Sequence, residues 1–229
     1  MLQKPSEAFR DRKKAPEGWV DLGMALCFND SMMYTEQYSS PLGTITIACD
    51  DEAIVGLWFN GLWFNGQKHF GNTLIGAVEV REKDQKHPLL EEAVKWLDIY
   101  FSGQEPSFLP LLRYDSTRFR KRVCDIMLTI PYGKTMTYGE IATIIAKELG
   151  IKKMSAQAVG GAVGNNPISL MIPCHRVVGA NGRLTGYGGG LNRKVKLLEL
   201  EKVDMSKLYN PSNETNNRTI EPNRISNKG

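Results

Sequence analysis

The chain has 229 residues, of which 41% are hydrophobic and 24% are charged, and its net charge is +4. This length suffices for one large domain or two small ones, and the composition is that of a folded globular protein. No apolar run is long enough to span a membrane, and the first residues lack the basic-then-apolar order of a signal peptide. We therefore expect a cytoplasmic protein, whose small positive charge is compatible with a polyanionic partner.

Four cysteines are spread along the chain without close spacing: Cys27, Cys49, Cys124 and Cys174. In a reducing compartment such cysteines are more often free thiols than disulfide partners. No set of histidines and cysteines has the spacing of metal ligands, and Cys27, Cys49, His69 and His87 would form a zinc site only if the fold happened to bring them together. We therefore predict free thiols, no metal site and no cofactor.

The first half of the chain has the pattern of a small sheet. A polar extension is predicted at residues 1–31. From residue 32 onward, β-branched and aromatic residues alternate with turn-forming residues. This pattern predicts three strands, at 34–38, 43–49 and 53–59.

A tandem repeat of Gly-Leu-Trp-Phe-Asn occupies residues 56–60 and 61–65. Five is an odd number, and side chains alternate faces along a strand, so one inserted copy exchanges the buried and exposed sets beyond it. We therefore predict that one copy loops out or lengthens a hairpin.

An apolar stripe predicts an amphipathic helix over residues 87–101, which Ser102 and Gly103 end. The stripe consists of Leu90, Val94, Leu97 and Phe101. Residues 104–113 contain two prolines and are predicted to link two domains.

Residues 117–163 predict three further helices, the first at 117–128. In the next, Thr137 and Glu140 fit a capping box, and Gly150 follows the end of the apolar stripe. Ser155 is placed to cap a short helix at 156–163. Helix, short turn and helix is the arrangement of a helix-turn-helix DNA-binding unit, although proteins that bind no DNA also use it.

Two adjacent glycines, Gly160 and Gly161, lie inside the second helix of this unit, where each costs about 1 kcal/mol relative to alanine. Two interpretations fit equally well. The glycines allow tight packing against the first helix, or they leave room for a phosphate or a flipped nucleotide.

The segment 171–178 places Cys174 beside His175 and Arg176, directly after a proline. A thiolate becomes a strong nucleophile when a base takes its proton or a positive charge lowers its pKa. Proline favours a rigid turn at this point and not a helix interior. The alternative is a buried structural cysteine, which is the commoner fate of a free cysteine.

A glycine-rich loop at 179–190 follows and is predicted to form a mobile wall beside Cys174, with Tyr187 as its one large side chain. It lacks the lysine and serine of a nucleotide-triphosphate loop. A last helix is predicted from 191 to about 202. Residues 204–229 are polar and are predicted to be disordered.

Four of these segments together resemble one family. The segments 130–140, 158–162, 166–178 and 186–190 are similar to motifs of the 6-O-alkylguanine-DNA alkyltransferases. The similarity extends over about residues 32–203. It implies an α+β protein, with an N-terminal α/β domain of ribonuclease-H-like topology and an antiparallel sheet at 32–112. It also implies a mostly helical, winged-helix-like domain with the helix-turn-helix unit at 113–203.

The resemblance implies direct repair of DNA. The family transfers an alkyl group irreversibly from O6-alkylguanine, or from O4-alkylthymine, to a cysteine sulfur, and the protein is consumed. The expected partner is double-stranded DNA carrying the lesion, bound by a monomer through the minor groove with the damaged base flipped out.

By position, the resemblance also implies catalytic roles. Cys174 is the nucleophile, and His175 takes its proton through a water. Glu201 orients and charges that histidine, which completes a relay of the kind that nucleophilic catalysis needs. Tyr138 donates a proton or hydrogen bond to the departing guanine.

Other positions are implied to contact the base or the DNA. Gln157 replaces the arginine with which the family fills the space left by the flipped base. The Gly188 N–H faces the base oxygen, Val163 packs on the base, and Asn166 is a structural hinge. The full predicted set is Gln157, Ala158, Gly160, Val163, Asn166, Arg176, Tyr187 and Gly188.

Three other functions compete with repair. A lesion sensor that does not repair lacks the cysteine that is present here. A helix-turn-helix regulator needs a polar recognition helix, whereas residues 156–163 are rich in glycine and alanine. A cysteine hydrolase uses a cysteine and a histidine that are separated in sequence.

Overall fold

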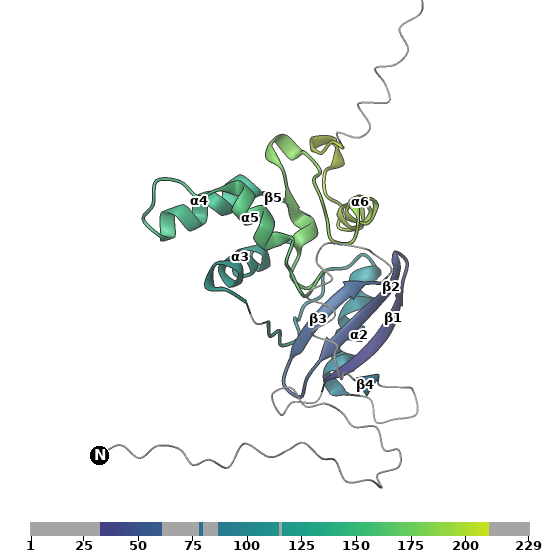
Figure 1. Ribbon diagram of the computed structural model, residues 1–229. Helices are drawn as coiled ribbons and strands as arrows, with labels where there is room; N and C mark the ends of the chain where they lie inside the picture. Colours follow the sequence, from purple (N-terminus) through teal and green to yellow (C-terminus); the bar gives the residue numbers. More distant parts are fainter. Residues whose placement is uncertain (1–32, 61–77, 80–86, 115, 211–229) are drawn as a thin grey trace, which may run out of the picture.

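The computed structural model describes residues 33–60, 78–79, 87–114 and 116–210. An N-terminal sheet with one helix stands beside a group of helices from the C-terminal half (Figure 1). The predicted α+β class is therefore confirmed. The extension at 1–31 and the second copy of the tandem repeat at 61–65 lie outside the described residues. Within the described ranges, no helix is long and apolar enough to cross a membrane.

Three antiparallel strands form the sheet, as predicted. They are β1 (Tyr34–Ser40), β2 (Gly43–Cys49) and β3 (Ile54–Phe59), and the first copy of the repeat lies at the end of β3. A two-residue strand, β4 (Val78–Glu79), pairs with β1 in the parallel direction. Helix α2 (Pro88–Phe101) packs on the sheet with its apolar stripe inward, because that stripe recurs at the helical period.

The helices of the C-terminal half begin close to their predicted caps. The capping box of Thr137 and Glu140 starts α4 (Tyr138–Glu148), and the Ser155 hydroxyl caps α5 (Ala156–Val163). Both helices pack on each other and on α3 (Arg118–Leu128), which gives the predicted helix-turn-helix arrangement. The last helix is α6 (Leu191–Leu200). Two short strands, β5 (Met136–Thr137) and β6 (Val177–Val178), pair in parallel.

The segment 104–113, which was predicted to link the two domains, also joins the sheet edge at its end. Ile54 N–H donates to the Leu111 carbonyl at 2.8 Å, and Arg113 N–H donates to the Ile54 carbonyl at 2.9 Å. The Arg113 guanidinium also forms an ion pair with the buried carboxylate of Asp50. An edge strand offers unpaired backbone groups, and this segment satisfies them.

The prediction that residues 204–229 are disordered is wrong for residues 204–210. Residues 205–207 form a 3-10 turn, and Leu184 N–H donates to the Tyr209 carbonyl at 2.8 Å. Leu208 packs against a small apolar cluster that contains Leu184 and Leu198. These contacts order the chain to residue 210, and residues 211–229 lie outside the described part.

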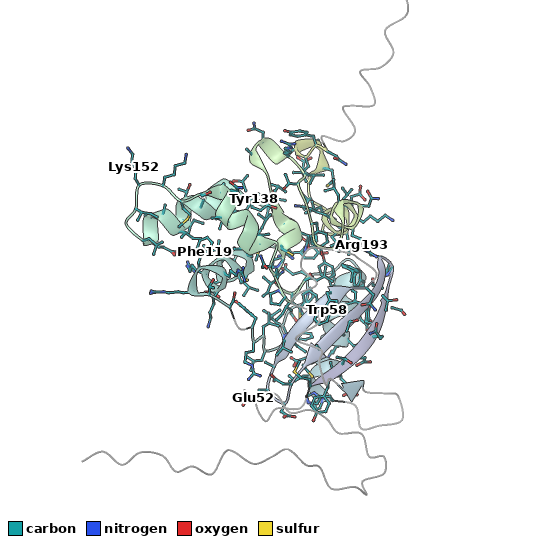
Figure 2. All side chains as sticks on the ribbon, in the orientation of Figure 1. Glu52, Trp58, Phe119, Tyr138, Lys152 and Arg193 are labelled. Carbon is teal, nitrogen blue, oxygen red and sulfur yellow. The ribbon has the colours of Figure 1, made fainter. Side chains whose placement is uncertain are left out.

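The N-terminal and C-terminal halves share one core, and their backbones meet at Leu57 of β3. Leu57 N–H donates to the Pro167 carbonyl at 3.1 Å, and Ser169 N–H donates to the Leu57 carbonyl at 2.8 Å. Arg193 of α6 crosses to the sheet and donates to the Leu42 carbonyl at 2.7 Å (Figure 2). The segment that leads into Cys174 is therefore fixed on the N-terminal sheet.

Candidate active site

Cys174 opens a single 3-10 turn, Cys174–Arg176, directly after Pro173, as the proline predicts. Asn166 braces the preceding chain, because its side chain donates to the Ile172 carbonyl at 2.8 Å and accepts from Ile168 N–H at 3.1 Å. The cysteine is 7% exposed. Burial raises the pKa of the Cys174 thiol, although hydrogen bonds and the Lys194 charge oppose that rise. The thiol therefore needs a base to ionise readily.

His175 and Glu201 form a buried pair beside this cysteine. His175 Nε2 lies 2.6 Å from Glu201 Oε1, and Glu201 caps the C-terminal end of α6. Arg176 Nε donates to Oε2 of the same carboxylate at 2.8 Å. Burial alone would raise the pKa of Glu201, but its bonds to His175 and Arg176 outweigh burial and lower the pKa to about 2. Glu201 is therefore a carboxylate at neutral pH.

The contact with Glu201 fixes the tautomer of His175. An ionised carboxylate only accepts hydrogen bonds, so the proton of the neutral imidazole lies on Nε2. Burial lowers the pKa of His175, which keeps the ring neutral at rest. Nδ1 is buried and has no hydrogen-bond partner among the described residues. A bare lone pair on Nδ1 is what a base for the adjacent thiol requires.

Tyr138 is the first residue of α4 (Figure 2). Its hydroxyl accepts a hydrogen bond from the Thr185 hydroxyl at 3.3 Å, and it interacts electrostatically with Cys174. Burial raises the pKa of Tyr138, so the phenol keeps its proton and remains a possible donor.

The glycines of α5 are not required for tight packing. A Cβ atom at Gly160 would make ordinary contact with the Tyr138 ring at 3.8 Å, and one at Gly161 would meet nothing within 4 Å. Gln157 and Ala158 are exposed on the first turn of the helix, whereas Val163 is buried at its end. The open-space interpretation is therefore the better of the two that the sequence allowed.

The glycine-rich loop carries one exposed and one buried member of the predicted set. Gly188 is exposed, and a Cβ atom there would meet nothing within 4 Å. Tyr187 is 4% exposed and packs edge-on to His175, with ring centroids 6.4 Å apart. Tyr187 is therefore buried beside His175, whereas Gly188 is on the surface of the loop.

Arg176 also points inward. Its guanidinium binds Glu201, donates to the Ile130 carbonyl at 2.7 Å and lies over the Tyr132 ring. Its predicted contact with DNA does not fit this placement, because the side chain is only 11% exposed. The positive charge of Arg176 instead stabilises the Glu201 carboxylate.

Two buried polar side chains at the site were not predicted from the sequence. Lys194 is fully buried in α6 and donates to the carbonyls of Val177 at 2.5 Å and Thr185 at 3.2 Å. Burial lowers its pKa to about 8. The second is Tyr100 of α2, in the N-terminal domain, whose hydroxyl donates to the Glu201 carboxylate. Each lies at helical spacing from buried apolar residues of its helix, and a polar residue on such a buried face is the signal that would have found them.

No group of three or more histidine, cysteine or acidic side chains in the described ranges is arranged to hold a metal ion. Of Cys27, Cys49, His69 and His87, which could meet only through the fold, two do meet: Cys49 Sγ lies 3.4 Å from His87 Nδ1. Cys27 and His69 lie outside the described residues. Cys49, Cys124 and Cys174 are free thiols.

Two domain families match this chain. The ribonuclease-like domain of 6-O-methylguanine DNA methyltransferase matches residues 33–111, and the DNA-binding domain of that protein matches residues 118–203. The chain belongs to the 6-O-methylguanine DNA methyltransferase family. Among this family, the methylated-DNA–protein-cysteine methyltransferase of Methanosarcina acetivorans is 39% identical over 172 residues, which are 74% of this chain and 98% of that protein.

Two mycobacterial members are also similar. The Mycobacterium leprae methylated-DNA–protein-cysteine methyltransferase is 53% identical over 111 residues, which are 48% of this chain. The match spans 64% of the M. leprae protein, less than two thirds of its length. A crystal structure of Mycobacterium tuberculosis OGT in complex with DNA superposes with a TM-score of 0.59 at 38% identity, covering 76% of this chain and 94% of that one.

The lowered pKa of Glu201 predicts a pH-dependent contribution to stability. A carboxylate whose pKa falls from 4.5 to about 2 on folding stabilises the fold above pH 4.5, and this stabilisation is lost as the pH falls toward 2. In urea unfolding, the gap in free energy of unfolding between wild type and Glu201→Gln should be constant above about pH 5 and should narrow below pH 4.5. Glu199→Gln, at an exposed position of the same helix, should show the wild-type pH dependence. A Glu201→Gln gap that stays constant down to about pH 2.5 would contradict the assignment.

Proposed function

We propose that this protein repairs alkylated DNA by moving the alkyl group from O6 of guanine in a duplex to Cys174, once per molecule. The observation that carries the proposal is the buried His175–Glu201 pair beside Cys174, with Nδ1 of the histidine unpartnered. Membership of the family and the similarity to a relative crystallised with DNA support it. The reaction is that of a methylated-DNA–protein-cysteine S-methyltransferase.

The nucleophile is the Cys174 thiolate. His175 Nδ1 takes the thiol proton, directly or through a water, and becomes an imidazolium. Glu201 stabilises that imidazolium through the 2.6 Å contact with Nε2. The thiolate sulfur then attacks the alkyl carbon, so that a C–S bond forms while the bond from carbon to guanine O6 breaks.

The leaving guanine must receive a proton as that bond breaks. Tyr138 is a protonated donor near Cys174, and the Gly188 N–H on the exposed loop offers a second donor for the base oxygen. Lys194 holds the loop against β6, because its Nζ bonds carbonyls of both segments. The proton that His175 took from the thiol then returns through solvent to Tyr138, so that the products are unmodified guanine and S-alkylated Cys174, and no step regenerates the thiol.

The target base must leave the duplex to reach Cys174. Extrusion costs a few kcal/mol, less where the lesion already weakens pairing. Gly160, which faces the Tyr138 ring without a side chain of its own, leaves room beside that ring for the extruded nucleotide, and Val163 lies at the far end of the same helix. Exposed Gln157 fills the vacated position in the stack. Binding through the minor groove as a monomer, and action on O4-alkylthymine, belong to the same proposal.

A division into an N-terminal domain at 32–112 and a catalytic domain at 113–203 accompanies this proposal. The two family models, which meet between residues 111 and 118, support a boundary in this region. Arg113, at this boundary, pairs with Asp50 of the N-terminal domain.

The first test is the mass of the Cys174 peptide after incubation with duplex DNA carrying O6-methylguanine. Wild type should gain one methyl group per molecule, while Cys174→Ala should gain none and should still bind the duplex. Cys124→Ala, which removes another buried thiol, should transfer as wild type does. An unmodified Cys174 peptide in a protein that binds the lesion tightly would instead indicate a sensor, and methylation of another cysteine would refute the choice of nucleophile.

A second test concerns Gln157. Each added phosphate contact steepens the slope of log K against log salt by about one unit. Gln157→Arg should therefore bind duplex DNA with a slope about one unit steeper, whereas Gln104→Arg, an exposed glutamine beyond α2, should not change it. Fluorescence anisotropy at several salt concentrations measures both. Equal slopes for the two variants would show that Gln157 does not face the DNA.

A further inference from the structure

Tyr100 brings the N-terminal domain into contact with the Cys174 turn. It lies in the last turn of α2 and is fully buried, whereas Cys174, His175 and Glu201 all come from the C-terminal half. Its hydroxyl donates to Glu201 Oε1 at 2.8 Å and lies 3.2 Å from His175 Nε2. A hydroxyl from another domain therefore touches both members of the buried pair.

The two oxygens of Glu201 have different partners. Oε2 accepts from Arg176 Nε at 2.8 Å and from Gly133 N–H at 3.2 Å. Oε1, the oxygen beside the imidazole, is within 3.1 Å of Arg176 Nη2 and accepts from Tyr100. Tyr100 thus fixes the oxygen that meets His175.

The Tyr100 hydroxyl acts as a permanent donor. Burial and the Glu201 charge raise the pKa of Tyr100 well above its ordinary value of 10, so it keeps its proton at working pH. A hydroxyl has one proton, which here goes to Glu201, and its lone pairs face Nε2. The Nε2 proton therefore meets two acceptors, which leaves Nδ1 to act as the base.

The ring of Tyr100 is itself held in place by its neighbours. It stacks on Trp96 at 5.2 Å between centroids and meets Phe101 and Tyr132 edge-on at 5.4 Å and 6.2 Å. Tyr100→Phe would keep these ring contacts and remove only the oxygen, so the hydroxyl can be tested without emptying the core.

We propose that Tyr100 is a positioning residue for alkyl transfer, which holds the Glu201 carboxylate and the His175 ring in the orientation that accepts the Cys174 proton. The effect of Tyr100 on the rate of methyl transfer rests on the proposed function, whereas its effect on the ionisation of the Cys174 thiol does not. The N-terminal domain then serves the chemistry directly, because it supplies part of the relay.

Two readouts test the role of the hydroxyl. In Tyr100→Phe, the single-turnover rate of methyl transfer should fall about tenfold with unchanged affinity for DNA. The pH midpoint for iodoacetamide alkylation of Cys174, followed by the mass of its peptide, should rise, because a poorly oriented His175 accepts the thiol proton less readily. The titratable groups that face His175 are Cys174, Arg176, Tyr100, Tyr187, Lys194 and Glu201, and the substitution leaves all but Tyr100 in place.

A control and a double-mutant cycle separate positioning from stability. Leu90→Ala empties the same core at the other end of α2 and leaves the ring contacts of Tyr100 in place, so it should lower stability and leave the pH midpoint unchanged. In a Glu201→Gln background, Tyr100→Phe should change the transfer rate less than twofold, since its effect passes through Glu201.

The outcomes are distinguishable from those for the proposed function. A wild-type rate and midpoint in Tyr100→Phe would overturn the inference, as would a tenfold loss that persists in the Glu201→Gln background. If wild type gained no methyl group but Tyr100→Phe still raised the midpoint, the proposed function would fail and the positioning of the His175–Glu201 pair by Tyr100 would stand.

Discussion

The hydrogen bond between Glu201 and His175 is the contact on which the rest of the site depends. A buried carboxylate stays ionised only when donors surround it, and here Tyr100, His175, Arg176 and Gly133 all donate to Glu201. The anion in turn holds the imidazole proton on Nε2. Nδ1 is then free to accept the proton of a thiol whose own pKa is raised by burial. Without the carboxylate, Cys174 would be an inert buried cysteine.

Segments far apart in the sequence must meet for this contact to form. The turn at Cys174 is anchored to β3 through Ile168 and its neighbours, α6 brings Glu201 and Lys194, and α2 brings Tyr100. Arg193 joins α6 to the sheet through the Leu42 carbonyl. The N-terminal sheet therefore supports the turn at Cys174, while Gln157 and Ala158 in the first turn of α5 remain exposed.

Features set by local sequence were predictable, and features set by distant contacts were not. The capped starts of α4 and α5 and the turn at Cys174 follow from neighbouring residues such as Thr137, Ser155 and Pro173. The inward direction of Arg176 and the docking of Arg113 depend on partners that are remote in sequence. Tyr100 and Lys194 were missed for a related reason: helical spacing shows that a residue faces the core, but not which buried group it meets there.

The tautomer of His175 tests the central claim most directly. The chain has three histidines, so a nitrogen-15 NMR spectrum of histidine-labelled protein is simple, and a His175→Gln variant identifies the signals of His175. If the Glu201 carboxylate keeps the imidazole proton on Nε2, that nitrogen should have the chemical shift of a protonated nitrogen across neutral pH. Nδ1 should have the chemical shift of an unprotonated one. A proton on Nδ1, or on both nitrogens, at pH 7 would mean that His175 is not available as the base for Cys174.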